Sequence, residues 1–336
     1  MSQTVRFLVL LLTAATAGLA MAQDATRVSW ALAIHGGAGV IARGSLSPEQ
    51  ERAYRAALSG ALEAGAAVLR RGGSSLDAVE ATIRLLEDDP LFNAGRGAVF
   101  TADGRNELDA SIMDGSTRKA GAVAGVTRTR NPISLARTVM ERSPHVMLAR
   151  EGADQFSLEQ GLEQVEPSYF YTERRWQELL DWRRDHTAAP DPTHSRGTVG
   201  AVALDTNGHL AAGTSTGGTT GKRWGRIGDS PVIGAGTYAA DGNCAVSATG
   251  AGELFIRASA ARQVCDRIAW QRASAQEAAD ATIADIGSIG GDGGLVVMDG
   301  SGRIAFSMNT SGMYRGWATS GVPAGTAIYS NEKGLN

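Results

Sequence analysis

Apolar residues recur at three- and four-residue intervals between residues 48 and 70, which predicts an amphipathic helix. Ser47, Pro48 and Gln50 mark its start as a capping box with proline at the first helical position, and Gly72 follows its end. A second helix is expected over residues 75–88, where Pro90 stops it. The same spacing predicts helices at residues 133–141, 253–268 and 275–286.

Short apolar runs between these helices predict strands at residues 30–34, 98–101, 107–113, 120–126 and 246–249. Two hairpins are indicated, one joining 199–204 to 210–214 through Asn207 and Gly208, the other joining 295–298 to 304–308. Residues 167–197 lack a clear pattern, and the stretch 188–193, with two prolines, is typical of a linker. Together these elements predict sheets covered by helices in layers.

The first residues predict export. Arg6 precedes an apolar run over residues 7–12, and Ala20, Met21 and Ala22 offer a small-residue cleavage site. The run is shorter than the ~20 residues that a membrane-spanning helix needs. We therefore expect a signal peptide over residues 1–22, a periplasmic or secreted protein, and no membrane association after the signal is removed.

An oxidising compartment would allow Cys244 and Cys265 to pair. One lies in a predicted strand and the other in a predicted helix. We therefore expect each to be a small, buried, unpaired side chain.

Composition removes one class of partner. The 336 residues carry a net charge of −3 and form no stripe of Lys and Arg that could neutralise phosphates, so nucleic acid is not an expected partner. The 43 glycines exceed the average usage of about 7%. This excess indicates tight turns, or backbone that approaches a ligand closely.

Several familiar active sites are excluded because the residues that should accompany their motifs are missing or misplaced. Residues 213–217 match G-x-S-x-G, but all five histidines precede Ser215, whereas an α/β-hydrolase places its histidine after the serine. Residues 116–119 match S-x-x-K, yet neither S-D-N nor K-T-G occurs. Residues 35–39, H-G-G-A-G, lack the rest of a phosphate loop or dinucleotide fingerprint, and the histidines show no metal-ligand spacing.

A hydroxyl nucleophile still needs a base, and the terminal amine of the same residue can supply one. An α-amino group has an unperturbed pKa of about 7.7–8.0, so part of it is neutral near physiological pH. Gly197 and Thr198 stand where the weakly patterned segment meets a predicted strand. Cleavage between them would create such a terminus inside the fold.

Longer motifs surround this point: residues 197–205, 213–218 and 225–231, together with N-A-G-R-G at 93–97, E-L-D-A at 107–110, M-D-G at 113–115 and N-T-S-G-M at 309–313. They resemble the plant-type asparaginase and isoaspartyl peptidase family, over nearly the whole chain after residue 30. The resemblance implies an α+β fold, the four-layer αββα sandwich of N-terminal-nucleophile hydrolases. It also implies a precursor that cleaves itself into an α subunit (23–197) and a β subunit (198–336), assembled as a dimer of heterodimers, (αβ)2, that hydrolyses L-asparagine or β-aspartyl dipeptides.

The resemblance also assigns roles. Thr198 would be nucleophile and base after cleavage from Gly197, and Thr216 would orient it. Thr249 and Gly250 match an oxyanion hole, a pairing that suits a developing negative oxygen. The remaining matches are Arg226 for the substrate's α-carboxylate, Asp229 for its α-amino group, and Asn93 as support for the threonine.

No cofactor is expected for catalysis, but the segment 86–94 resembles a structural sodium loop. Carbonyl oxygens suit this hard cation. The matching ligands, mostly through backbone carbonyls, are Leu86, Glu87, Asp89, Phe92, Ala94 and Arg96. Arg96 replaces the usual apolar residue, and Ser195 and Arg196 separate His194 from the cleavage point, which puts a role for His194 in doubt.

Two other functions stay open. Glycosylasparaginases usually carry T-N-G where this chain has Thr216, Gly217 and Gly218. A secreted binding protein could also keep this fold without ever being processed. The sequence does not rank asparagine against β-aspartyl dipeptides.

Overall fold

The computed structural model describes residues 28–39, 41–185, 197–332 and 334. The predicted signal peptide (1–22) and the segment that contains His194 lie outside these residues. The helices are α2 (Pro48–Arg70), α3 (Ser75–Asp88), α4 (Pro132–Arg142), α5 (Arg150–Glu159), α6 (Glu173–Asp185), α7 (Gly252–Ala258), α8 (Ala260–Gln271) and α9 (Ala275–Ser288), with short 3-10 turns η1 (Gly95–Gly97) and η2 (Pro167–Phe170).

The strands form two sheets. The larger sheet has the order β12-β11-β1-β5-β6-β2-β3-β4, and the smaller one has the order β10-β9-β8-β7. Their bounds are β1 (Ala31–Gly39), β2 (Leu108–Asp114), β3 (Ala120–Val126), β4 (Met147–Ala149), β5 (Val199–Leu204), β6 (Leu210–Thr216), β7 (Thr237–Ala240), β8 (Cys244–Gly250), β9 (Gly293–Asp299), β10 (Ile304–Met308), β11 (Gly312–Thr319) and β12 (Gly325–Tyr329). All neighbouring strands run antiparallel except β3 and β4.

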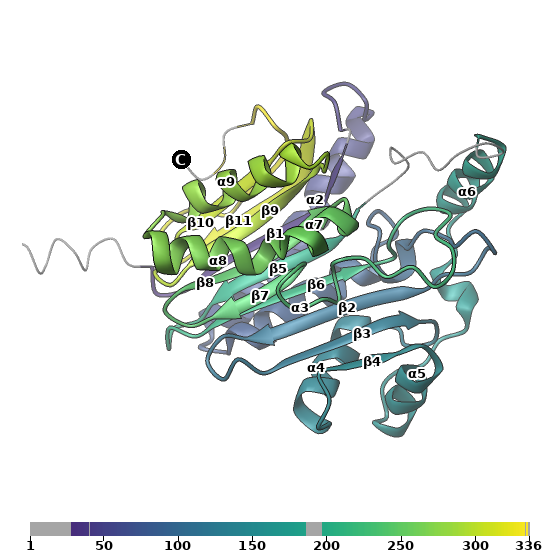
Figure 1. Ribbon diagram of the computed structural model, residues 1–336, viewed down its shortest axis with the longest axis horizontal. Coiled ribbons are helices and arrows are strands. Elements are labelled where there is room, and N and C mark those ends of the chain that lie inside the picture. Colours follow the sequence, from purple (N-terminus) through teal and green to yellow (C-terminus); the bar gives the residue numbers. More distant parts are fainter. Residues whose placement is uncertain (1–27, 40, 186–196, 333, 335–336) are drawn as a thin grey trace, which may run out of the picture.

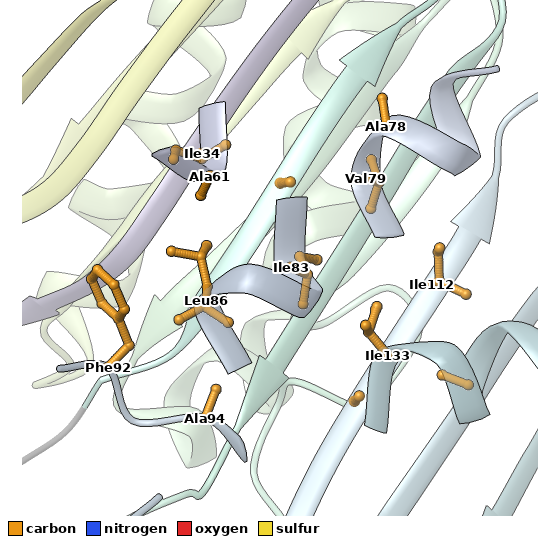
Figure 2. Close-up of a cluster of buried hydrophobic side chains, with 14 of the residues drawn as sticks. Ile34, Ala61, Ala78, Val79, Ile83, Leu86, Phe92, Ala94, Ile112 and Ile133 are labelled. Carbon is orange, nitrogen blue, oxygen red and sulfur yellow. The ribbon is translucent and has the colours of Figure 1, made fainter. Parts of the chain in front are cut away.

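The two sheets pack face to face, with β1, β5 and β6 against β8 and β9 (Figure 1). Helices α2, α3 and α4 contact the large sheet, while α8 and α9 contact the small one. One hydrophobic core lies between α2–α4 and the large sheet and includes Ile34, Val79, Ile83 and Ile112 (Figure 2). A second core contains side chains from both sheets and from α8 and α9. The predicted mixture of sheets and covering helices is confirmed.

Where local signals were strong, the elements match the prediction. The capping box forms at the start of α2, with Gln50 N donating to Ser47 Oγ at 3.2 Å and Ser47 N to Gln50 Oε1 at 2.8 Å. The predicted hairpins 199–204/210–214 and 295–298/304–308 correspond to β5–β6 and β9–β10. The resulting register places Val199 opposite Ser215.

Three local predictions are wrong. Residues 98–101 form no strand beyond a single bridge between Thr101 and Lys222. The helix expected over 253–268 is two helices, because Ser259 takes a left-handed conformation with φ of 49°. Within the weakly patterned segment 167–197, where no helix was predicted, residues 173–185 form α6, which buries Arg175, Leu179 and Trp182. The linker expected at 188–193 lies outside the described residues.

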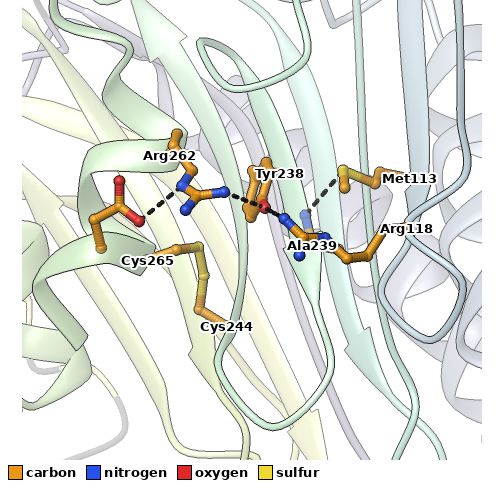
Figure 3. The surroundings of a disulfide bond; sticks show 8 residues. Met113, Arg118, Tyr238, Ala239, Cys244, Arg262 and Cys265 are labelled. Atoms are coloured by element: carbon orange, nitrogen blue, oxygen red, sulfur yellow. Dashed lines mark hydrogen bonds and ion pairs between the residues drawn. A yellow bond between two sulfur atoms is a disulfide. The ribbon is translucent and has the colours of Figure 1, made fainter. Parts of the chain in front are cut away.

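Cys244 and Cys265 form a disulfide, which corrects the expectation that they are unpaired (Figure 3). Cys244 lies on β8 and Cys265 on α8, and α8 packs on β8, so the two Cα atoms are 5.5 Å apart. The two cysteines therefore lie on different elements, a strand and a helix, but are close in space. No helix in the described part of the chain is long and apolar enough to span a membrane.

Candidate active site

Thr198 immediately precedes β5, a central strand of the large sheet, and is almost fully buried. Its Oγ1 donates to Thr216 Oγ1 at 3.1 Å. Thr216 ends β6, the strand paired with β5, so the hairpin register brings the two threonines together. Thr216 Oγ1 in turn donates to the carbonyl oxygen of Gly197 at 3.0 Å. A directed chain of hydrogen bonds thus runs from the Thr198 hydroxyl to the carbonyl of the preceding peptide bond.

Asn93 supplies a second donor to that carbonyl. Its Nδ2 lies 2.9 Å from Gly197 O and 2.7 Å from Gly218 O, and its Oδ1 accepts from Val99 N at 2.9 Å. All hydrogen-bonding groups of the amide are therefore occupied, which fixes its orientation. Two donors on one carbonyl oxygen polarise the Gly197–Thr198 peptide bond toward attack at carbon.

Thr249 and Gly250 end β8. Thr249 Oγ1 accepts from Ala38 N at 3.3 Å, which leaves the hydroxyl hydrogen available for donation. Gly250 has φ of 153°, and a Cβ there would overlap the Asp292 carbonyl. Gly250 lines a cleft of about 320 Å³ together with Asn93 and Gly197.

Gly36 and Gly37 of the H-G-G segment, which belongs to β1, line the same cleft. A Cβ on Gly37 would lie 3.0 Å from Gly197 Cα and 3.2 Å from Thr198 N, so the segment packs closely against the Gly197–Thr198 peptide bond. Gly37 also has φ of 109°, a conformation that favours glycine. From the sequence, this segment was tested only as a phosphate loop, a dinucleotide fingerprint or a source of metal ligands, and so its place here was missed.

Arg226 and Asp229 lie side by side around Gly252, where a built Cβ would be 2.8 Å from Arg226 Nη2 and 2.9 Å from Asp229 Oδ1. Gly218 connects this pair to the threonines. Its N donates to Thr216 Oγ1 at 3.0 Å, and a Cβ on it would lie 3.3 Å from Arg226 Nη1. The structure therefore brings the predicted substrate-binding residues next to the predicted nucleophile.

Burial raises the pKa of Asp229 to about 7, against the opposing effect of the Arg226 charge. Its Oδ2 is buried and has no hydrogen-bond partner among the described residues. A carboxylate held in this way gains from a cationic ligand, because it would otherwise be desolvated without compensation.

Glu253 is a neighbour that the sequence analysis missed. It accepts from Arg226 through both oxygens, at 2.8 Å from Nε and 3.0 Å from Nη2. Such a two-point ion pair fixes the plane of the guanidinium. Its position three residues after Gly250 is the one sequence signal that could have identified it.

His35 was also missed as a site residue. Its Nδ1 lies 2.9 Å from Thr198 O, and its Nε2 lies 2.8 Å from Ser247 Oγ. Burial lowers the pKa of His35 to about 3, so the ring is neutral and donates from Nδ1 to the carbonyl. The chain of buried hydroxyls continues between the sheets through Ser247, Thr214, Thr237 and Ser111.

In the predicted sodium loop, two backbone carbonyl groups lie close to Gly95 and Gly97. Built Cβ atoms on Gly95 and Gly97 would overlap the carbonyls of Glu87 and Phe92, respectively. Those of Asp89 and Ala94 each accept one backbone hydrogen bond, from Phe92 N and Gly97 N. A turn lined with carbonyl oxygens fits a hard monovalent cation. Among the described residues no group of three His, Cys, Asp or Glu side chains could hold a metal.

The side chains of the loop point elsewhere. The Glu87 carboxyl is buried and accepts from Ser215 Oγ at 2.7 Å and Ile133 N at 2.9 Å. Burial raises the pKa of Glu87 to about 8. The Arg96 guanidinium lies over the Tyr169 ring, 5.9 Å from its centroid. Any contribution of Glu87 or Arg96 to the loop interior therefore comes from the backbone.

Comparison with known proteins shows the family of the chain. The family model described as asparaginase matches residues 28–328. The chain is 50% identical to the isoaspartyl peptidase of Escherichia coli over 311 residues, covering 90% of this chain and 97% of that protein. It is 42% identical to the human isoaspartyl peptidase/L-asparaginase over 271 residues, covering 80% and 86% of the two chains. The probable isoaspartyl peptidase/L-asparaginase 2 of Arabidopsis thaliana is 43% identical over 315 residues, covering 86% and 96%.

Matches of this extent, on a structure that brings Thr198, Thr216 and Asn93 together at the Gly197 carbonyl, decide the family. The chain belongs to the asparaginase family and is a hydrolase of the isoaspartyl peptidase and plant-type L-asparaginase type.

Proposed function

We propose that this protein cleaves itself between Gly197 and Thr198, and that the released Thr198 then hydrolyses L-asparagine or β-aspartyl dipeptides. The observation that carries the proposal is the hydrogen-bond chain from Thr198 Oγ1 through Thr216 Oγ1 to the Gly197 carbonyl, which Asn93 also polarises. These residues are held in the precursor in an arrangement that suits attack by the hydroxyl.

In self-cleavage, Thr198 Oγ1 attacks the Gly197 carbonyl carbon, and its proton passes to Thr216 Oγ1 while the proton of Thr216 passes to the carbonyl oxygen. Asn93 and Thr216 donate to the carbonyl oxygen as it becomes negative. The C–N bond breaks, the nitrogen of Thr198 takes the proton, and an ester joins Gly197 to Thr198 Oγ1. Water then hydrolyses this ester, leaving a carboxylate on Gly197 and a free amine on Thr198.

In turnover, the free amine takes the Thr198 hydroxyl proton while Oγ1 attacks the amide carbon of the substrate. Thr249 Oγ1–H and Gly250 N–H donate to the tetrahedral oxygen. The leaving nitrogen takes the proton from the Thr198 amine as its bond to carbon breaks, and water hydrolyses the resulting aspartyl ester. His35 fixes the Thr198 carbonyl, so the nucleophile keeps its place after the chain is cut.

Arg226 tests the proposed substrate orientation. Loss of a charge-assisted hydrogen bond costs about 1.5–3 kcal/mol, so Arg226→Ala should lower kcat/KM by roughly one to two orders of magnitude. Cleavage before Thr198 should still occur, because Arg226 lies outside the chain of bonds that links Thr198 to Gly197. Steady-state kinetics on cleaved variant protein measure this.

Glu253→Gln is the matched control, since it keeps the shape and removes the charge that pairs with Arg226. We expect a smaller rise in KM and little change in kcat. Equal cleavage of β-aspartyl substrates with and without a free α-carboxylate on the aspartyl residue would contradict the assignment of Arg226.

Asp229 gives a pH prediction. A pKa of about 7 means that the carboxylate fraction rises from roughly a tenth at pH 6 to nine tenths at pH 8. Only the ionised form accepts an ammonium well, so the Kd of the product aspartate should tighten by roughly tenfold over that interval. Succinate lacks the amino group and should show no such tightening. Calorimetric titration of mature protein with both ligands at pH 6, 7 and 8 provides the comparison.

Further proposals accompany the reaction. The layers follow one another as helices, large sheet, small sheet and helices, and this order supports assignment to the αββα N-terminal-nucleophile fold.

We propose α (23–197) and β (198–336) subunits assembled as (αβ)2, which light scattering of mature protein would test. We also propose a structural sodium ion held by the carbonyls of residues 86–96, which would stiffen the loop that carries Asn93.

Export to the periplasm or medium is proposed from residues 1–22 and is tested by N-terminal sequencing of the exported protein near Gln23. A glycosylasparaginase-like amidase or an unprocessed binding protein are the alternatives. A substrate panel on mature protein distinguishes a glycosylasparaginase-like amidase from the proposed enzyme. Fragment masses distinguish an unprocessed binding protein from it.

A further inference from the structure

The cleft at the cleavage point has a wall with no part in the reaction proposed above. The cleft is lined by Gly197 and Gly250, and also by Arg174, Arg175 and Glu178 of α6. Its volume of about 320 Å³ suits a group the size of an amino acid.

This cleft lies on the leaving-group side of Thr198. Arg226 and Asp229, which we propose hold the aspartyl half of the substrate, are not among its lining residues. Gly197 does line it, so cleavage opens the cleft onto the new amine of Thr198. That amine must pass its proton to the leaving nitrogen, and the leaving group therefore has to extend from there into the cleft.

Arg174 is the unbalanced charge of the cleft wall. Arg175 is buried and pairs with Glu178 at 2.9 Å. Arg174 donates only to uncharged groups, namely Tyr54 Oη at 3.0 Å and the carbonyls of Pro90 at 3.0 Å and Leu91 at 2.8 Å. In the described part of the chain no carboxylate pairs with it. These three bonds use three of the five guanidinium N–H groups.

The same wall offers an apolar surface. Tyr54 and Tyr314 line the cleft with stacked rings, whose centroids are 4.1 Å apart. Leu46 and Leu91 line it too. The remaining charged residue of the cleft, Asp292, adjoins Gly250, since Ala251 N donates to its carbonyl at 2.9 Å. The cation and the aromatic pair therefore line the same cleft as Gly197 and Gly250.

We propose that Arg174 binds the free α-carboxylate of the leaving amino acid of a β-aspartyl dipeptide, and that Tyr54 and Tyr314 contact its side chain. This inference rests on the proposed function and makes it more specific. Asparagine releases ammonia, which has neither a carboxylate nor a side chain. The cleft thus favours β-aspartyl dipeptides with an apolar second residue over asparagine.

The test compares mature wild-type protein with Arg174→Met on three substrates: β-aspartyl-leucine, its C-terminal amide and L-asparagine. Wild-type kcat/KM should be about 10- to 100-fold higher for the dipeptide than for its amide, as for a charge-assisted hydrogen bond. Arg174→Met should remove that difference and leave the amide and asparagine within about twofold. Arg183→Met is the matched control, because Arg183 lies on the same helix and donates to the Ala102 carbonyl outside the cleft.

Equal losses on all three substrates would overturn the inference, because Arg174 would then only support the 90–91 loop. Equal wild-type kcat/KM values on the dipeptide and its amide would also overturn the inference. This comparison needs no variant, so it remains decisive if Arg174→Met does not fold. Wild-type protein inactive on all three substrates would instead overturn the proposed function, and this subsite with it.

Discussion

Thr198→Ala is expected to leave the chain in one piece and to abolish hydrolysis. Alanine has no hydroxyl to attack the Gly197 carbonyl, so the amine needed for turnover is never released. Loss of a catalytic nucleophile has lowered kcat by roughly 10⁶ in another hydrolase. Denaturing electrophoresis, intact mass and an ammonia-release assay on the same preparation measure both effects.

Thr198→Ser is the control for this change. It keeps the hydroxyl and the bond to Thr216, so cleavage should proceed, more slowly, and activity should appear with the fragments. An uncleaved Thr198→Ala protein that still hydrolyses asparagine or β-aspartyl-leucine would contradict the mechanism, because no free amine on residue 198 would then be required.

Thr249→Val should give a protein that matures and binds substrate but turns over slowly. Valine keeps the shape of the threonine side chain and removes one donor to the tetrahedral oxygen. Loss of such a donor has cost about 10²–10³ in kcat elsewhere. An interaction made only in the transition state lowers kcat and kcat/KM together and leaves KM unchanged.

Thr249→Ser keeps the hydroxyl and should retain most of the activity, although it also removes a methyl group from a buried position. Steady-state kinetics on cleaved protein compare the two variants. If Thr249→Val turned over at the wild-type rate, the residue would be a strand-end threonine that supports Ala38 and nothing more.

Local chemistry made some elements predictable and left others hidden. The capping box of α2 and the tight turn between β5 and β6 are encoded by neighbouring residues. Helix α6 is rich in Arg, Glu and Trp, so its sequence has no apolar stripe that would predict a helix. Its stability comes from tertiary packing of residues such as Leu179. The Cys244–Cys265 disulfide likewise depends on how α8 packs on β8.

The candidate site divides in the same way. Thr198, Arg226 and Asp229 sit in specific motifs, so the resemblance placed them by number. His35 and Glu253 needed the structure, because His35 reaches Thr198 across 163 residues of sequence and Glu253 reaches Arg226 across 27. A sequence pattern cannot give such pairings.

The most direct test of the central claim is the intact mass of the freshly purified wild-type protein. The account predicts two chains, with the second beginning at Thr198, and predicts that hydrolysis of β-aspartyl-leucine rises in step with the cleaved fraction during incubation. A single chain with full activity and an intact Gly197–Thr198 bond, or an active protein that is cut at another internal bond in place of that one, would contradict it.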